Sequence, residues 1–253
     1  MSDFLTRHSR TILLNEINYE GQKNISQSKV LLVGAGGIAS SIISILASSG
    51  VEEIVIWEAD KLELSNLQRQ FIFQQSDVGR SKVDLAKNFA LNLNSKIKIT
   101  AINKELNEES FSEFNNCVKN IDIIIDSTDS FKSRVLSNMS SIKNEKPFFT
   151  GSAIGFEGQV YSFFGSARNL PCYSCLFGSN YKEFVEKRTC SNSGVFPPIP
   201  TIIGSLIAQN ALHFLATEKC DFLKFILVNF CNQNYFKEIK MKKDPKCKAC
   251  KIN

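Results

Sequence analysis

Apolar residues in the first half of the chain follow two alternating patterns. Short runs rich in Val, Ile and Phe have strand length, at "KVLLVG", "EEIVIWEAD", "KIKITAIN", "IDIIID" and "PFFTGS". Between them, helical spacing predicts helices over 38–49, 79–94, 107–120 and 130–143. This alternation indicates a mostly parallel, Rossmann-like sheet with right-handed crossovers. The fully apolar "IDIIID" is expected to be buried on both faces.

The pattern changes after Gly151. "GQVYSFFG" predicts another strand, residues 166–200 show no regular period, and "TIIGSLIAQNALHFLA" predicts a helix. Two last strands, "FLKFILVNF" and "QNYFKEIKM", precede a charged tail that contains two cysteines. The fold predicted is therefore α/β, with a Rossmann-like, mostly parallel sheet continued by antiparallel strands.

We expect one domain over residues 1–253. Residues 1–28 form a short helical arm, 29–150 a half of alternating strands and helices, and 151–253 a half that carries most of the cysteines. There is no internal repeat and no low-complexity tract.

Composition narrows the function classes. With 43% hydrophobic and 22% charged residues the chain is globular, and its net charge of +5 is too mild and too scattered for a nucleic-acid binder. No uninterrupted apolar run has membrane-spanning length, and the N-terminus lacks the apolar core of a signal peptide. A cytoplasmic protein without a membrane partner is expected, in which the eight cysteines are thiols or metal ligands.

A glycine-rich turn follows the first predicted strand. Gly34, Gly36 and Gly37 let backbone N–H groups approach a phosphate at a helix N-terminus. About twenty residues later, Glu58 or Asp60 is placed to bind ribose hydroxyls. The turn fits NAD and ATP equally, and a tight turn without a ligand is the alternative.

Polar and cationic residues follow the second strand, where open α/β sheets bind ligands. Asn66, Arg69, Gln70 and Lys82 lie on this rim. Two cations there favour a triphosphate over a dinucleotide, because negative charge grows on a leaving pyrophosphate. The alternative for any one of them is a solvated helix start.

Asp126 and Asp129 lie at the carboxyl end of "IDIIID". Carboxylates beside bound phosphates usually hold Mg²⁺, so both are expected at the nucleotide and Asp129 at the metal. Asp129 also precedes a predicted helix, which makes an N-cap the alternative role.

Two C-x-x-C pairs, Cys172 with Cys175 and Cys247 with Cys250, have the spacing of a tetrahedral structural zinc site. Redox pairs are the alternative. Cys190 lies in a polar stretch after a Lys-Arg pair, which would lower its pKa and make it reactive; an incidental surface thiol is equally consistent.

Only two histidines occur, so mechanisms that need a histidine base are poorly supported. A substrate carboxylate is already ionised at neutral pH and attacks the α-phosphate of ATP without losing a proton. The enzyme then only positions the reactants and stabilises charge.

The sequence resembles the ThiF/MoeB/HesA family, bacterial relatives of ubiquitin-activating enzymes. The glycine turn, "LSNLQRQ", "GRSK", "DSTD", "GQV", "PCYSC", "SGV" and "CKAC" occur in family order over nearly the whole chain. The resemblance implies ATP-dependent adenylation of the C-terminal Gly-Gly carboxylate of a ubiquitin-like sulfur-carrier protein, with a sulfurtransferase as a further partner. It also implies a homodimer in which the N-terminal arm reaches the neighbouring site. Residues 29–150 would then be the nucleotide-binding half, and residues 151–253 the half that binds the carrier protein and zinc.

The same resemblance assigns roles to single residues. Arg10 matches the arginine of the arm, and Cys190 matches a cysteine that can link to the carrier. The positions that match family contacts to ATP and Mg²⁺ are Asp60, Arg69, Lys82 and Asp129.

The chain departs from the family pattern at Ala39, Glu58, Ser130 and the "FPPIP" turn. "DFLTRHSRTILLNEI", "SAIGFEGQ" and "RTCSNSGV" favour the ThiS carrier of thiazole synthesis over the MoaD carrier of molybdopterin synthesis. Adenylation of another peptide C-terminus, an NAD-dependent dehydrogenase and a dimeric scaffold without turnover are the remaining alternatives.

Overall fold

A computed structural model describes residues 3–165, 170–178, 180, 194–231 and 235–250. In this part of the chain, the strands form a single sheet in the order β3-β2-β1-β4-β5-β6-β7-β8. The parallel strands are β1 (Lys29–Val33), β2 (Glu53–Trp57), β3 (Lys98–Ile102), β4 (Ile123–Asp126) and β5 (Phe148–Ile154). The antiparallel strands are β6 (Glu157–Phe163), β7 (Lys224–Asn229) and β8 (Phe236–Lys240). The predicted α/β fold, with a mostly parallel sheet continued by antiparallel strands, is confirmed.

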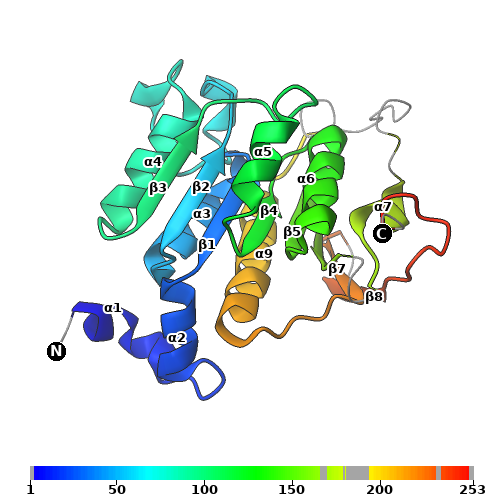
Figure 1. The fold of residues 1–253 in the computed structure, drawn as a ribbon. Coiled ribbons are helices and arrows are strands. Elements are labelled where there is room, and N and C mark those ends of the chain that lie inside the picture. The colour runs from blue at the N-terminus through cyan, green and yellow to red at the C-terminus, as the bar shows by residue number, and fades with distance from the viewer. Residues whose placement is uncertain (1–2, 166–169, 179, 181–193, 232–234, 251–253) are drawn as a thin grey trace.

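Helices cover both faces of the sheet (Figure 1). One face carries α3 (Gly37–Ser49), α4 (Lys82–Leu93) and α9 (Pro198–Thr217); the other carries α5 (Phe111–Val118), α6 (Phe131–Asn144) and α7 (Tyr173–Phe177). The N-terminal arm is helical as predicted, with α1 (Asp3–Ile12) and α2 (Asn18–Ser26). Two short 3₁₀ turns, η1 (Leu64–Asn66) and η2 (Gln75–Asp77), lie between β2 and α4.

The centre of the sheet is buried on both faces. Ile123, Ile124 and Ile125 of β4 are each 0% exposed, as their uninterrupted apolar run predicts. Neighbouring side chains of β4 point to opposite faces, so they contribute to two separate cores. The sequence pattern therefore located the middle strand of the sheet.

The prediction of an irregular segment over 166–200 was wrong at two places. A short helix, α7, begins at Tyr173, and α9 begins at Pro198, three residues before the predicted start. Proline is tolerated in a first helical turn because the N–H that it lacks has no partner there. The prolines therefore open α9 instead of preventing it.

Helix α9 is long and apolar enough to cross a membrane, by length and composition alone. In the structure it packs against α3, β5 and β6, and half of its most apolar window is buried. A core helix of a folded domain passes the same test.

Helices α3 and α9 approach each other closely at Gly204. A Cβ added there would lie 2.2 Å from the carbonyl oxygen of Ile38 and 3.0 Å from the Cβ of Ser41. The Ile38 oxygen belongs to the helix backbone, so neither helix can yield without moving as a whole. Only glycine fits this crossing.

We expect Gly204→Ala to lower the free energy of unfolding by about 3 kcal/mol, the upper part of the usual range for overpacking. Urea denaturation measures the change. Gln209→Ala, on the exposed side of the same helix, is the control and should change stability by less than about 0.5 kcal/mol. Equal midpoints for both variants would show that the helices separate freely.

Candidate functional site

The strand register brings four loops together at one edge of the sheet. Val33, the last residue of β1, pairs with Trp57 of β2 and with Asp126 of β4, and Asp126 pairs with Thr150 of β5. The segments that follow these residues therefore begin at the same height. They line a cavity of about 830 Å³ at the carboxyl ends of the strands, the position expected for a ligand in an open parallel sheet.

The glycine turn forms the floor of this cavity. Gly34 has φ of +93°, and a Cβ there would lie 2.9 Å from the Ser127 hydroxyl oxygen, so this turn needs glycine. Gly36 is the N-cap of α3, and no side chain caps this helix end among the described residues. The first N–H groups of α3 are consequently available for an anion.

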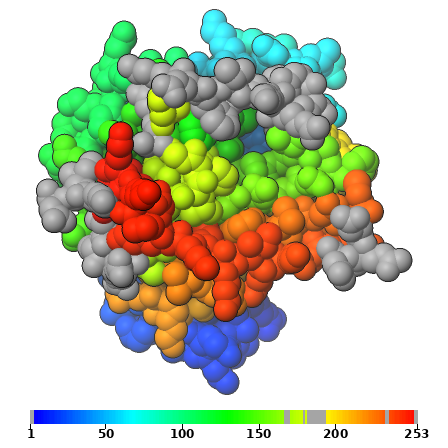
Figure 2. Space-filling view, turned by 90° about the vertical axis from the view of Figure 1, so that its right-hand side faces the viewer, coloured from blue at the N-terminus to red at the C-terminus, as the bar shows by residue number. Residues whose placement is uncertain are grey.

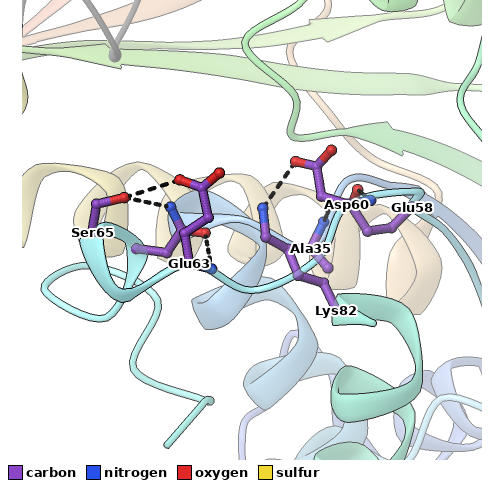
Figure 3. A network of polar contacts seen from close by, with 7 residues as sticks. Ala35, Glu58, Asp60, Glu63, Ser65 and Lys82 are labelled. Atoms are coloured by element: carbon purple, nitrogen blue, oxygen red, sulfur yellow. Dashed lines mark hydrogen bonds and ion pairs between the residues drawn. The ribbon is translucent and has the colours of Figure 1, made fainter. Parts of the chain in front are cut away.

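Glu58 holds the turn from the side (Figure 3). Its two carboxylate oxygens accept hydrogen bonds from the backbone N–H groups of Ala35, at 2.8 Å, and of Asp60, also at 2.8 Å. The side chain thus links the glycine turn to the segment after β2. Glu58 therefore positions the backbone and also lines the cavity, at which the sequence predicted that Glu58 or Asp60 binds ribose hydroxyls.

Lys82 and Asp60 form an ion pair across the cavity wall, at 2.9 Å between Nζ and Oδ2 (Figure 3). The lysine side chain is 7% exposed and the aspartate side chain 69% exposed. The carboxylate therefore compensates a buried ammonium group while remaining accessible itself. Asp60 lies in the segment that follows β2, and Lys82 is the first residue of α4; both line the cavity, as predicted.

Asn66, Arg69 and Gln70 also line the cavity, as predicted. The Asn66 side-chain oxygen accepts the Glu63 N–H, which closes the η1 turn, and Arg69 donates to the Ser65 carbonyl oxygen at 3.0 Å. Gln70 is buried, and its Oε1 has no hydrogen-bond partner among the described residues. This segment therefore places the Arg69 guanidinium and the unpaired Gln70 side-chain oxygen at the cavity.

The two aspartates at the carboxyl end of β4 differ in their exposure to solvent. Asp126 is 0% exposed, is not among the cavity-lining residues, and accepts hydrogen bonds from Thr128, Ser133 and Ser137. This arrangement is at odds with the expected nucleotide contact, because its oxygens already bind the start of α6. Its side chain instead fixes the loop that carries Asp129.

Asp129 is exposed at the cavity and does not cap the following helix. Ser130 is the N-cap of α6, and its hydroxyl accepts the Ser133 N–H at 3.2 Å. The serine that departs from the family pattern therefore performs the capping role considered for Asp129. The Asp129 carboxylate is left facing the cavity, where it could hold a divalent cation.

Sequence reasoning missed Arg134. This residue of α6 lines the cavity and donates through Nη2 to the carbonyl oxygens of Thr128 and Gly151, the second at 3.0 Å. Burial alone would lower the pKa of its guanidinium, but Tyr173 and the Asp126 and Asp129 carboxylates raise it. Its position in the first turn of a helix that follows a parallel strand is the signal that could have identified it.

The cavity has the polar character that a nucleotide needs. Trp57, Gln70 and Arg134 each leave one buried polar atom without a partner in the described part of the chain. All three belong to residues that line the cavity. Gly36 adds open space, since a Cβ there would meet only the Gln70 amide, at 3.7 Å. These polar atoms could form hydrogen bonds with a polar ligand in the cavity.

The four predicted zinc ligands come together from distant parts of the sequence. Sγ distances are 3.7 Å for Cys172 to Cys175, 3.8 Å for Cys172 to Cys247, and 3.5 Å for Cys175 to Cys250. Four sulfurs at about 2.3 Å from a tetrahedral zinc ion would be roughly 3.8 Å apart. Figure 2 shows the C-terminal segment lying against the α7 region.

Burial raises the pKa of the Cys172 thiol, and it raises the pKa of Cys250 to about 12. Without a cation these buried sulfurs would stay protonated at neutral pH. A bound metal ion would stabilise them as thiolates. Both the sulfur geometry and the donor chemistry therefore fit zinc.

Besides Asp126, two further predicted residues are not placed at the cavity. Arg10 is exposed on α1 and is not among the residues that line the cavity. Helix α1 lies beside α2, which leads into the start of β1 (Figure 1). Cys190 lies outside the described residues.

The sequence was compared with protein families and with known proteins, and it matches one family over almost its whole length. The sequence profile of the ThiF family matches residues 8–249. The molybdopterin-synthase adenylyltransferase of Salmonella typhimurium is 31% identical over 249 residues, covering 97% of this chain and 96% of that protein. The sulfur carrier protein adenylyltransferase of Thermus thermophilus is 29% identical, covering 97% and 90%.

Other relatives are longer. The adenylyltransferase and sulfurtransferase MOCS3-1 of Zea mays is 38% identical over 213 residues, which cover 83% of this chain and 44% of that protein. The chain spans about half the length of such relatives.

Among solved structures, Escherichia coli MccB with ATP gives a TM-score of 0.80 at 22% identity, covering 99% of this chain and 76% of that one. This likeness shows the shared fold alone. The match of the family profile to almost the entire chain, together with a full-length relative above 30% identity, shows that the protein belongs to the ThiF family.

Proposed function

We propose that the protein is an adenylyltransferase that activates the C-terminal carboxylate of a ubiquitin-like sulfur-carrier protein. One observation carries the proposal: the glycine turn, Arg69, Lys82 and Asp129 converge on one cavity. Two full-length relatives are named as adenylyltransferases of sulfur-carrier proteins or of molybdopterin synthase. These names leave no support for the dehydrogenase alternative.

The cavity suits a reaction in which the substrate supplies the nucleophile. Its described lining residues include no histidine and no cysteine. The carrier carboxylate would attack the α-phosphorus of ATP, forming a carboxyl–phosphate bond while the bond between the α-phosphorus and the bridging oxygen breaks. Pyrophosphate leaves with the electron pair, and no proton transfer is required. The protein then has to align two anions and stabilise the charge of the leaving group.

Each residue has a role in that task. The glycine turn and the α3 N-terminus would bind phosphate oxygens through backbone N–H groups. Arg69 and Lys82 would stabilise the negative charge on pyrophosphate, and Asp60 would be released from Lys82 to contact the ribose. Asp129 would hold Mg²⁺, which neutralises phosphate charge and orients the phosphates.

The protomer by itself does not supply an excess of positive charge. Among the described lining residues, the cations Arg69, Lys82, Lys104 and Arg134 are matched by the acids Glu58, Asp60, Glu105 and Asp129. A triphosphate therefore needs additional cations. We propose that Mg²⁺ and Arg10 of a second copy supply them, which requires a homodimer. The exposed Leu13 and Leu14, close to Arg10 in the sequence, offer apolar surface for such a contact (72% and 52% exposed).

The names of the relatives favour one carrier. Three sequence segments favoured the ThiS carrier of thiazole synthesis, but a molybdopterin-synthase adenylyltransferase is 31% identical to this chain over nearly its whole length. We therefore propose a MoaD-type carrier, the alternative considered from the sequence. We further propose that a separate sulfurtransferase supplies sulfur to the activated carrier, and that the four cysteines hold zinc.

The proposal predicts that labelled pyrophosphate is exchanged into ATP only when a carrier with a free C-terminal Gly-Gly carboxylate is present. The exchange should be lost with a carrier whose C-terminus is amidated, because the nucleophile is then neutral. MoaD-type and ThiS-type carriers, and a short peptide with a free carboxylate, are compared in the same assay. Exchange of equal rate without any carrier would contradict the proposal, and faster exchange with the peptide would point to peptide adenylation.

A further inference from the structure

The segment 127–130, between β4 and α6, carries Asp129 to the cavity. Its other side chains are all bound to the protein. Ser127 Oγ donates to the Val33 carbonyl oxygen at 2.8 Å, and the Ser130 hydroxyl caps α6. The Asp129 side chain, in contrast, has no hydrogen-bond partner among the described residues. Its carboxylate therefore remains available to a ligand while the segment around it is held.

Thr128 is held at all three of its polar groups. Its backbone N–H and its hydroxyl both donate to Asp126 Oδ1, at 3.0 Å and 2.6 Å. Its carbonyl oxygen accepts a hydrogen bond from Arg134 Nη2, which also donates to the Gly151 carbonyl oxygen of β5 at 3.0 Å. The residue that precedes Asp129 in the chain is thus fixed from two directions.

The Asp126 carboxylate ties three elements together. It is the last residue of β4, it is 0% exposed, and its Oδ2 accepts hydrogen bonds from Ser133 and Ser137 of α6, at 2.7 Å and 2.9 Å. A buried carboxylate must be satisfied by donors, and hydrogen bonds to a charged acceptor are stronger than those between neutral groups. Strand β4, the segment after it and α6 therefore share one strong anchor.

We propose that Asp126 is a positioning residue for the divalent cation of the nucleotide site. By holding Thr128, it fixes the direction in which Asp129 faces, although Asp126 itself does not line the cavity. Arg134 completes the hold from the carbonyl side. The two aspartates thus have different tasks, one binding the cation and the other orienting that ligand. This inference rests on the proposed function, because it assigns the cavity to ATP and Mg²⁺.

The test removes contacts on both sides of the Asp126 carboxylate. Thr128→Val keeps the shape of the side chain and removes the hydroxyl, and Thr128→Ser retains the hydroxyl. Ser137→Ala removes a donor to the other oxygen, from a residue that does not line the cavity. Ser140→Ala is the matched control, because Ser140 is an equally buried serine of α6 whose hydroxyl donates to Asn115 at 3.0 Å.

Mn²⁺ is the probe for the cation, because electron paramagnetic resonance reports the concentration of the free ion. The zinc-loaded protein is titrated with Mn²⁺ in the presence of a non-hydrolysable ATP analogue. We expect Thr128→Val to weaken Mn²⁺ binding about fivefold to tenfold and Ser137→Ala about threefold, since each loses a hydrogen bond to a charged group. Thr128→Ser and Ser140→Ala should change it by less than about twofold.

A second titration separates positioning from direct contact with the nucleotide. The affinity for the ATP analogue is measured without any divalent cation. If the loop only orients the metal ligand, Thr128→Val and Ser137→Ala should keep this affinity within about twofold of the wild type. Weaker binding of the analogue by Thr128→Val under these conditions would show that the hydroxyl contacts the nucleotide itself, which would contradict the inference.

Three further outcomes would count against the inference. Equal Mn²⁺ affinities of Thr128→Val and Thr128→Ser would show that the hydroxyl does not fix the loop. Equal effects of Ser137→Ala and Ser140→Ala would show that the loss of any buried hydroxyl of α6 has the same result. Wild-type protein that binds neither the ATP analogue nor Mn²⁺ would overturn the proposed function and this inference with it, whereas the first two outcomes leave the proposed function standing.

Discussion

Replacing Asp129 with alanine is expected to lower the rate of carrier-dependent pyrophosphate exchange by at least about 100-fold to 1000-fold, the range for losing one well-placed charge-stabilising group. The carboxylate is exposed at the cavity, while Ser130 caps α6 in its place. Its removal should therefore leave the helix intact. The loss would come from weaker binding and poorer orientation of Mg²⁺ and the phosphates.

The control for this prediction is Asp84→Ala. Asp84 is an exposed carboxylate on α4 that does not line the cavity, so the variant removes the same charge from another place. We expect it to retain wild-type exchange, and both variants to keep the wild-type melting temperature. Asp129→Asn separates charge from size and should be as inactive as the alanine variant. Full exchange by Asp129→Ala would show that another group holds the metal.

Replacing Cys247 with serine should reduce bound zinc from about one ion per chain to none. The three remaining sulfurs leave one coordination position without a thiolate. Binding free energies of structural zinc in small domains are about 10–16 kcal/mol, of which local unfolding of the tail would offset a large part. We expect a net loss of about 3 kcal/mol, which corresponds to a fall in melting temperature of roughly 6–12 °C.

Cys231→Ser is the matched control, since Cys231 is exposed and is not one of the clustered cysteines. It should keep its zinc and its stability. Metal analysis by mass spectrometry and thermal denaturation measure both quantities. A wild-type protein that folds with its normal stability and contains no metal would remove the proposed role of the cluster.

Much of the site could be predicted because the carboxyl ends of parallel strands lie at the same edge of the sheet. Gly34, Lys82 and Asp129 follow different strands or loops, yet the sheet register alone brings those segments to one edge. The C-x-x-C spacing likewise indicated a shared metal site. For the cavity and for the cysteine cluster alike, a local sequence pattern predicted that residues far apart in the sequence lie close together in the structure.

Other features depended on atomic positions that no local pattern contains. Asp126 has the residue type of a nucleotide ligand, but it does not line the cavity, and its oxygens already accept hydrogen bonds from backbone and hydroxyl donors. Arg134 shows no distinctive spacing and was missed, although it lines the cavity. Whether a polar side chain is available to a ligand depends on what else it contacts.

By itself, the sequence determined the α/β fold, the glycine turn, the cationic rim and the cysteine pairs. These features follow from periodicity and spacing, which act over a few residues. Only the tertiary structure decided that Asp129 lines the cavity while Asp126 is buried, and that Arg134 lines the cavity and donates to the carbonyl oxygens of Thr128 and Gly151. Such distinctions arise because packing between distant segments fixes the burial of each polar atom, and burial decides which hydrogen bonds it must make.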